Sequence, residues 1–217
     1  METGLKDIHQ LKQEFDNLNS SDNLAYIRFY ESNLYSIDRI DIGKDNNHYN
    51  AKLRLFSEYG LSLVGGGHYT KGATVLEKAI PMFENAPNQD FNNLRKASYF
   101  EHLLWSYGVA LWETKQIESS IKVFNRLVDY YPDNDKYRIW LNGLKATKIK
   151  KYTKPLWIGI AIWFVCDFTI FEKFDSIVQF RLSIFGATLL VIVGLLELYI
   201  YITKKKKARS TTMHHKA

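Results

Sequence analysis

Two apolar runs near the C-terminus place the tightest constraint on this chain. They extend from Pro155 to Phe171 and from Leu182 to Thr203, and each carries one charged side chain, Asp167 and Glu197 respectively. As α-helices the runs would be about 26 Å and about 33 Å long, against a hydrocarbon core of about 30 Å. We therefore predict a transmembrane helical hairpin over 155–203, with helices at 155–172 and 182–203.

Lys and Arg are concentrated at the outer ends of the two runs. Ten lie there, and only Lys173 and Arg181 lie in the connecting loop. The positive-inside rule then predicts an integral protein of the inner (plasma) membrane with both termini in the cytoplasm. The basic cytoplasmic tail, 204–217, is interpreted as a topology signal and headgroup anchor. Selective capture of anionic lipids by this tail is the alternative that the sequence leaves open.

The charge of the chain is divided between its two parts. Residues 1–144 hold 16 Lys and Arg against 19 Asp and Glu, a net charge of −3, whereas residues 145–217 hold 13 against 4, a net charge of +9. Because the soluble part lacks an excess of basic residues, we do not expect it to bind nucleic acid. The single cysteine, Cys166, excludes a disulfide within one chain, and the polar N-terminus does not read as a secretory signal.

Asp167 and Glu197 are the candidates for polar contacts inside the membrane. Charged residues are costly in lipid and often functional there, but these two would lie at different depths, about 18 Å and about 9 Å from the cytoplasmic ends. A direct pair within one hairpin is therefore not expected. Asp167 could face the outer headgroups or a partner helix, and Glu197 could reach the interface. Small residues such as Gly186 and Gly194 could pack the hairpin on itself or on another subunit.

Internal repetition organises residues 51–150. Segments beginning at Leu53 and Glu101 each show apolar residues at helical spacing, a short turn and a second such run. Each has a Tyr-Gly pair at the same place in its first helix, ending at Gly60 and Gly108. A glycine inside a helix costs about 1 kcal/mol relative to alanine, so its recurrence predicts close approach of a neighbouring helix. Helix pairs of this size cannot bury their apolar faces alone, and we predict that they stack.

This pattern resembles the tetratricopeptide repeat (TPR) family. Residues of the second unit at the family's spacing are Gly108, Leu111, Ser120, Phe124 and Pro132. Those of the first unit are Gly60, Gly67, Tyr69, Gly72 and Ala79. The chain departs from the family because its units start 48 residues apart rather than 34, and because Leu104 and Phe56 stand at the usual Trp position. The resemblance implies an all-α, TPR-like stack followed by the two transmembrane helices.

Further helices are expected on both sides of the two units. The N-terminal segment, 1–50, contains an amphipathic stretch from Leu5 to Leu18 and then a helix capped by Ser21 or Asp22 that runs to about Asp41. These helices could form a degenerate first repeat or fold into the groove of the stack. After Pro132, a last helix capped by Asn134 or Asp135 is expected through Lys145 or beyond. It would cover the open end of the stack and could run into the membrane.

In TPR-like stacks the first helices line a groove that binds peptides or partner proteins. Helical phase directs the following residues to that groove: Arg54, Ser57, Leu61, Val64, His102, Trp105, Val109 and Trp112. Trp105 and Trp112 are seven residues apart and share one helix face. They could form a binding hot spot, or they could pack against the preceding helix pair or the membrane-proximal helix.

No residue pattern in the sequence indicates catalysis, a cofactor or a metal site. Gly65-Gly66-Gly67 is not followed by the residues of a phosphate loop, and the six histidines show no metal-ligand spacing. We therefore predict a membrane-anchored adaptor, not an enzyme, that binds a protein or peptide at the cytoplasmic face. The alternative is an accessory subunit of a larger membrane complex, or a homo-oligomer, in which the hairpin makes the essential contacts.

Overall fold

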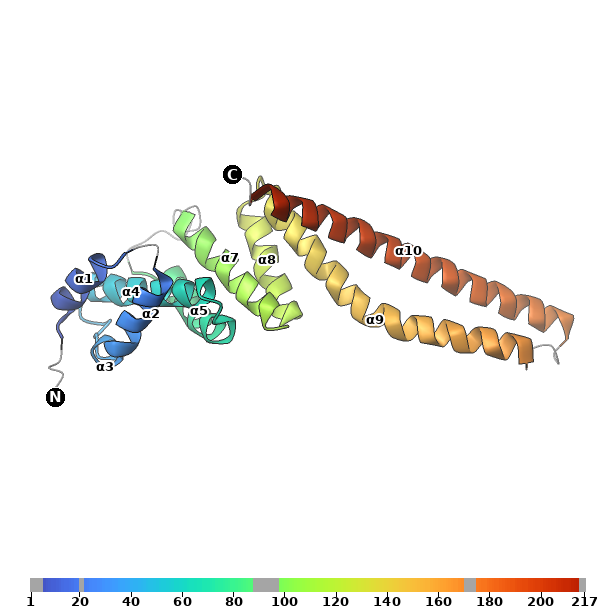
Figure 1. The fold of residues 1–217 in the computed structure, drawn as a ribbon, viewed down its shortest axis with the longest axis horizontal. Helices are drawn as coiled ribbons and strands as arrows, with labels where there is room; N and C mark the ends of the chain where they lie inside the picture. The colour runs from blue at the N-terminus through green and yellow to red at the C-terminus, as the bar shows by residue number, and fades with distance from the viewer. Residues whose placement is uncertain (1–5, 20–21, 88–97, 170–174, 215–217) are drawn as a thin grey trace. The chain divides into compact units, whose positions relative to one another are not determined.

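All regular structure in the described part of the chain is α-helical, as predicted. The computed structural model describes residues 6–19, 22–87, 98–169 and 175–214. Its helices are α1 (Ile8–Asp16), α2 (Asn23–Ser32), α3 (Leu34–Asp38), α4 (Asn46–Gly65), α5 (Tyr69–Glu84), α7 (Ser98–Glu113), α8 (Ile117–Tyr130), α9 (Asp135–Thr169) and α10 (Ser176–His214) (Figure 1). They form two compact units, Met1–Asp133 and Asn134–Ala217.

The two predicted repeat units are helix pairs with the same turn. The backbone N–H of His68 donates to the carbonyl of Leu63 at 2.7 Å, and 48 residues later Gln116 donates to Leu111 at 2.9 Å. The residue before each donor has positive φ, 81° in Gly67 and 65° in Lys115. This is the Schellman motif, in which a left-handed residue ends a helix and satisfies its last carbonyls. The 48-residue period of the sequence is therefore a period of the backbone as well.

The helices of each pair approach closely at a glycine, as the Tyr-Gly pattern predicts. A Cβ added to Gly60 would lie 2.7 Å from Leu76, and one added to Gly108 would lie 2.7 Å from Phe124. The partner residue lies 16 positions after the glycine in both units. In the second unit the contact is also polar, because Ser120 Oγ donates to the carbonyl of Gly108 at 2.8 Å. The small residues in the sequence pattern therefore set the distance between the paired helices.

The helix pairs of the first unit are stacked. Helix α7 packs against both α4 and α5, and α4 packs in the same way against α1 and α2. Aromatic rings fill the contacts near the N-terminus: Phe15 lies edge-on to Tyr26 with ring centroids 5.1 Å apart, and Tyr30 stacks on Tyr59 at 4.0 Å. The N-terminal helices therefore extend the hydrophobic core onto α4, where a preceding repeat would lie.

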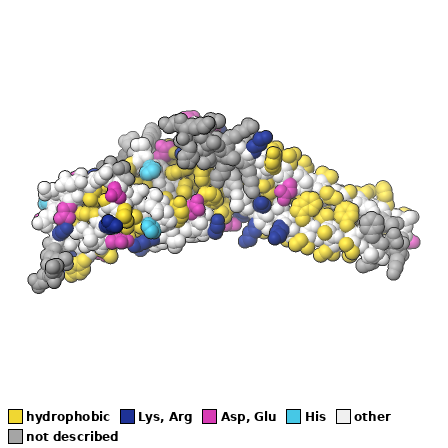
Figure 2. Space-filling view, in the orientation of Figure 1, with side chains coloured by type: hydrophobic (Ala, Val, Ile, Leu, Met, Phe, Trp, Pro, Cys, Tyr) yellow, Lys and Arg dark blue, Asp and Glu magenta, His cyan; other side chains and the backbone are white. Residues whose placement is uncertain are grey.

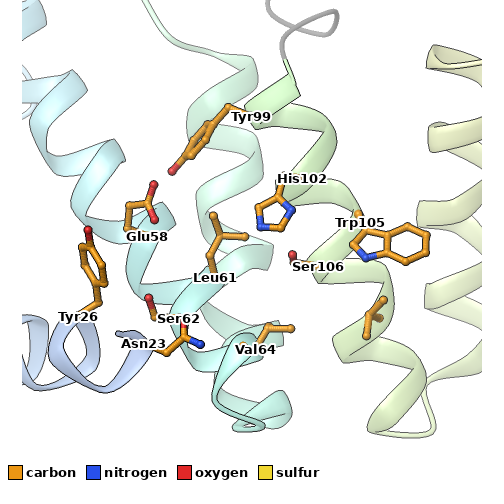
Figure 3. A pocket seen from close by; sticks show the side chains of 12 residues that line it. Asn23, Tyr26, Glu58, Leu61, Ser62, Val64, Tyr99, His102, Trp105 and Ser106 are labelled. Atoms are coloured by element: carbon orange, nitrogen blue, oxygen red, sulfur yellow. The ribbon is translucent and has the colours of Figure 1, made fainter. Parts of the chain in front are cut away.

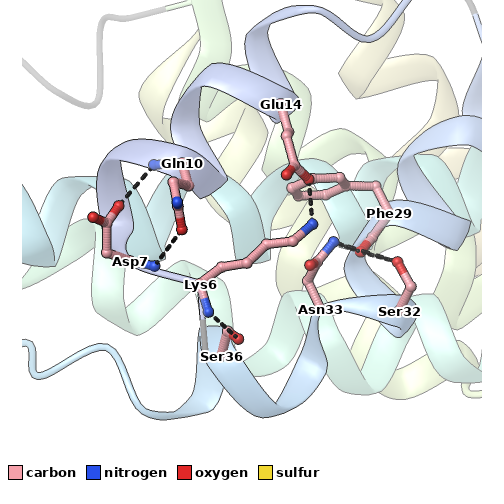
Figure 4. Close-up of polar contacts among 8 residues, drawn as sticks. All are labelled: Lys6, Asp7, Gln10, Glu14, Phe29, Ser32, Asn33 and Ser36. Carbon is pink, nitrogen blue, oxygen red and sulfur yellow. Dashed lines mark hydrogen bonds and ion pairs between the residues drawn. The ribbon is translucent and has the colours of Figure 1, made fainter. Parts of the chain in front are cut away.

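Capping residues define the N-terminal helices. Asp7 caps α1 in a reciprocal capping box with Gln10, and the backbone N–H of Lys6 donates to Ser36 Oγ at 3.2 Å (Figure 4). Asp22 caps α2 as predicted, by accepting from the N–H groups of Leu24 and Ala25.

The single helix predicted from residue 22 to about residue 41 is divided into α2 and α3. The division falls at Asn33, whose side-chain amide donates to the carbonyl of Phe29 at 2.8 Å (Figure 4). A side chain that binds the backbone in this way competes with continuation of the helix.

The second unit consists of α9 and α10, which lie side by side (Figure 1). Buried residues recur at intervals of seven along both helices: Thr153 and Ile160 in α9, and Gly186, Val193 and Ile200 in α10. A seven-residue spacing is typical of two helices that pack along a narrow seam. The two helices are in tight contact at Gly186, where an added Cβ would lie 2.6 Å from Trp163 Nε1. The predicted small residue thus packs the hairpin on itself.

The outer surface of this helix pair is apolar. Ile162 and Val165 of α9 are 59% and 63% exposed, and Val191 and Leu195 of α10 are 62% and 61% exposed. Hydrophobic side chains accordingly cover much of the α9–α10 surface in Figure 2. Within the described residues one segment, Ser176–Thr203, is long and apolar enough to cross a membrane by length and composition. The first predicted span is described from Pro155 to Thr169, about 22 Å of helix at 1.5 Å per residue.

Helix α9 joins the expected capping helix and the first apolar run through Pro155 without interruption, one of the outcomes that the sequence left open. Asn134 caps it by accepting from the N–H of Lys136 at 3.2 Å. Helix α10 continues through the basic tail to His214, although 204–217 is predicted as a separate segment. Lysine is a good helix former, and residues 204–214 contain neither Gly nor Pro, so the helix has no local reason to stop.

The two Schellman turns predict opposite effects of exchanging their left-handed residues. Lys115→Gly should raise the free energy of unfolding by about 1 kcal/mol, because a non-glycine residue in this conformation costs about 1–2 kcal/mol. Gly67→Ala should lower it by a similar amount, and no atom lies within 4 Å of the added Cβ, so no clash contributes. Urea unfolding of the full chain in detergent micelles, followed by circular dichroism, measures both. If both substitutions changed the free energy of unfolding in the same direction, the left-handed conformation of the two residues would be contradicted.

The glycine contacts predict a steric cost at Gly108 and not at Gly65. Gly108→Ala should destabilise the first unit by about 1–3 kcal/mol, because overpacking against the buried Phe124 ring exceeds the helix-propensity gain. Gly65→Ala is the matched control, since the three atoms nearest to its Cβ all belong to the side chain of exposed Asn23, which can turn away. The same urea titration compares the two variants. A Gly108→Ala protein as stable as the control would show that the close approach is unimportant.

Candidate binding groove

A cavity of about 430 Å³ opens between α2, α4 and α7 in the first unit (Figure 3). Two of its walls are α4 and α7, the first helices of the two repeats, and its lining includes the corresponding pairs Glu58/Ser106 and Leu61/Val109. Its lining residues are Asn23, Tyr26, Glu58, Leu61, Ser62, Val64, Gly65, Tyr99, His102, Trp105, Ser106 and Val109. A second cavity of about 380 Å³ shares Glu58 and Tyr99 with the first, and its other lining residues are Asn50, Leu53, Arg54 and Phe83.

The structure brings together five of the eight residues predicted to face the groove. Leu61, Val64, His102, Trp105 and Val109 all line the first cavity. The repeat alignment and the helical periodicity were therefore enough to predict residues on both the α4 wall and the α7 wall of the cavity.

The other three predicted groove residues lie elsewhere. Arg54 lines the second cavity, and Trp112 is half-buried and lines neither. Ser57 is fully buried, so its predicted groove exposure is wrong. The reason is that α7 packs on α4 and covers Ser57, which lies beside Tyr99 of α7.

The sequence left two roles open for Trp105, lining the groove or packing against a neighbouring helix, and the structure shows both. Its ring contacts the buried ring of Phe124 edge-on, with centroids 5.4 Å apart and an interplanar angle of 80°. It also forms part of the cavity wall. Removing this indole would therefore disturb the α7–α8 core as well as the cavity. Val109, which is half-buried and lines the same cavity, is a better position for probing binding.

The polar end of the cavity is formed by Tyr26, Glu58 and Tyr99. Figure 3 shows the Tyr99 hydroxyl turned towards the Glu58 carboxylate, with Tyr26 on the other side of that carboxylate. Burial and the nearby charge of Glu58 both raise the pKa of Tyr99, and the same two causes raise the pKa of Tyr26. Both phenols therefore stay protonated at neutral pH, and each can accept or donate a hydrogen bond.

Two hydroxyl groups beside Glu58 are buried and unsatisfied. Tyr99 OH and Ser57 Oγ make no well-aligned hydrogen bond with the described residues, although Tyr99 lies close to both Ser57 and Glu58. A buried polar atom left without a partner costs about 1–3 kcal/mol. Such atoms are rare in folded proteins and often mark a place where water or a ligand binds.

The cation nearest to this site is already engaged. Arg54 donates to Asp16 at 2.9 Å, and its guanidinium lies 5.1 Å from the centroid of the Phe15 ring. Arg54 therefore ties α4 to α1.

A polar contact fixes the α2 wall of the cavity in place. Glu31 of α2 accepts hydrogen bonds from Tyr59 OH of α4 at 3.0 Å and from Lys71 Nζ of α5 at 2.6 Å. The hydrogen bond from Lys71 lowers the pKa of Glu31, and the same bond raises the pKa of Lys71. One carboxylate thus joins three helices, and α2 presents Asn23 and Tyr26 to the cavity from a fixed position.

Several lining residues were not predicted from the sequence. Glu58 precedes Leu61 by three residues, and Tyr99 precedes His102 by three, so the same helical phase could have included both. Asn23 and Tyr26 could not have been found in this way, because α2 lies outside the two units that align.

The remaining candidates lie in the second unit. Glu197 is half-buried on α10, and the side chain of Asp167 lies outside the described residues. No group of three or more His, Cys, Asp or Glu side chains in the described part of the chain could hold a metal ion.

The unsatisfied hydroxyl predicts an unusual response to removal of a polar group. Tyr99→Phe should leave the free energy of unfolding unchanged or raise it by about 1 kcal/mol, because a buried hydroxyl without a partner costs stability. Tyr59→Phe is the control, since its hydroxyl is bonded to Glu31 and its loss should cost about 1 kcal/mol. Urea unfolding of both variants tests this. A clear loss of stability in Tyr99→Phe would mean that this hydroxyl is satisfied in the free protein.

Comparison of the chain with protein-family models, with curated proteins and with solved structures gives no match in any of the three. The function is therefore inferred from the geometry of the chain itself.

Proposed function

We propose that this protein is a membrane-anchored TPR-type adaptor that binds a protein or peptide partner at the cytoplasmic face of the membrane. The observation that carries the proposal is the cavity of about 430 Å³ between corresponding helices of two structural repeats. Its lining mixes apolar side chains with several groups that can form hydrogen bonds, as expected for a site that fixes the orientation of a bound segment.

The repeat geometry supports the TPR-type assignment. The two pairs share a Schellman turn and a glycine contact at the same positions, 48 residues apart. Helix α7 packs on both members of the preceding pair, which is how helical repeats build a continuous core and a shared inner surface.

The surface of the helix pair α9–α10 supports two membrane spans. Large apolar side chains are exposed on both helices, and among those on α9 are Trp157, Ile162, Phe164 and Val165. Contiguous apolar surface of this kind is rare on soluble proteins and marks contact with a membrane or a partner. The excess of Lys and Arg at the outer ends of the two runs favours cytoplasmic termini.

The proposed mechanism is binding without a chemical step. Residues 131–134 join α8 to α9, so whatever binds the cavity is tethered to the membrane by a short connection. Tethering raises the local concentration of a bound partner at the membrane without requiring a new contact.

A crosslinking experiment in intact membranes tests the proposal. Val109→Trp should fill the cavity and reduce the recovery of crosslinked partners by about tenfold or more, because the added ring occupies the space of the bound segment. Thr74→Trp places the same side chain on the exposed surface of α5, away from the cavity, and should leave recovery unchanged. Partners are identified by mass spectrometry after affinity purification.

A third variant, in which an unrelated hairpin replaces residues 155–203, distinguishes the adaptor proposal from the alternative of an accessory subunit of a membrane complex. The adaptor predicts that cavity partners persist in this chain when it is still held at the membrane. Partners that survive Val109→Trp and disappear with the hairpin exchange would overturn the proposal in favour of an accessory subunit of a membrane complex.

A further inference from the structure

The charge of the cavity lining is one-sided. Among the described residues that line it, Glu58 is the single carboxylate, and none is Lys or Arg. Glu58 forms no ion pair with any other described residue, and the nearby cation Arg54 is held by Asp16. A partly enclosed carboxylate without a counter-charge favours a cationic ligand.

The hydroxyl of Tyr99 beside Glu58 can bond to the same ligand. Tyr99 lines the cavity, and its hydroxyl can accept a hydrogen bond. An ammonium group brings three donors and a guanidinium brings five. Either could satisfy the hydroxyl of Tyr99 while it neutralises Glu58, whereas a neutral donor such as an amide would leave the carboxylate without a counter-charge.

The rest of the cavity suits the stem of such a side chain. Leu61 and Val109 supply apolar wall on α4 and α7, and both are half-buried. Lysine and arginine bury their methylene stems along apolar surface while the charged head meets a polar group. Aromatic rings at the polar end, those of Tyr26 and Tyr99, can also attract a cation.

We propose that the occupant of the cavity is a peptide segment of the partner that presents a lysine or arginine side chain, with its charged head bound by Glu58 and Tyr99. This inference rests on the proposed function and adds the chemical class of the partner. The net charge of −3 on residues 1–144 agrees with it, because an acidic domain attracts a basic segment from a distance.

Three labelled peptides test the inference on the full chain in lipid nanodiscs. Each has alternating leucine and serine around a central residue, which is lysine, norleucine or glutamate. Fluorescence anisotropy should show the lysine peptide binding about tenfold more tightly than the norleucine peptide, and the glutamate peptide more weakly than both, because only the charge at one position differs. Equal affinities of the three peptides, or no binding of the lysine peptide, would overturn the inference.

Variants show whether Glu58 is responsible. Glu58→Gln should remove the preference for lysine and leave the affinity for the norleucine peptide unchanged, whereas Glu77→Gln, on the exposed surface of α5, should change neither. A lysine preference that survives in a folded Glu58→Gln chain would overturn the inference.

The same peptides separate a failure of this inference from a failure of the adaptor proposal. A norleucine peptide that binds wild type but not Val109→Trp, without any preference for lysine, would keep the cavity as a binding site and exclude the basic segment.

Discussion

The spacing of paired helices at Gly60 and Gly108 is the constraint on which the first unit depends. At both positions a neighbouring side chain occupies the place of a Cβ, so α5 and α8 approach their partner helices more closely than any larger residue would allow. This distance places Leu76 and Phe124, both fully buried, in the core of their pairs. Because α7 packs on both α4 and α5, the position of the cavity wall follows from the same contact.

Much of this arrangement could be predicted from the sequence because it depends on local, periodic signals. The Tyr-Gly recurrence located the close contacts, and helical phase placed five residues on the cavity wall. The left-handed conformation of Lys115 has no local signal, because a lysine gives no sign of positive φ; the 48-residue alignment with Gly67 could have indicated it. Ser57 was wrongly predicted to face the groove, because helical phase defines a face of a helix but does not show which part of that face a neighbouring helix covers.

Tertiary contacts account for the features that the sequence did not reveal. Asn23 and Tyr26 reach the cavity because α2 is held by Glu31 against Tyr59 and Lys71, three residues that are far apart in the chain. Such contacts between distant residues have no signature within a short window of sequence.

The two units differ in where their large apolar side chains lie. The first unit buries its large apolar residues inside and leaves its two unsatisfied hydroxyls beside the one charged group of a cavity. A soluble core tolerates such orphan groups only where something compensates their cost. From Thr153 onwards the second unit buries little more than a narrow seam and exposes its large apolar residues. In the proposed function the first unit binds a cationic group and the second lies in lipid, so that a bound partner would be held at the membrane.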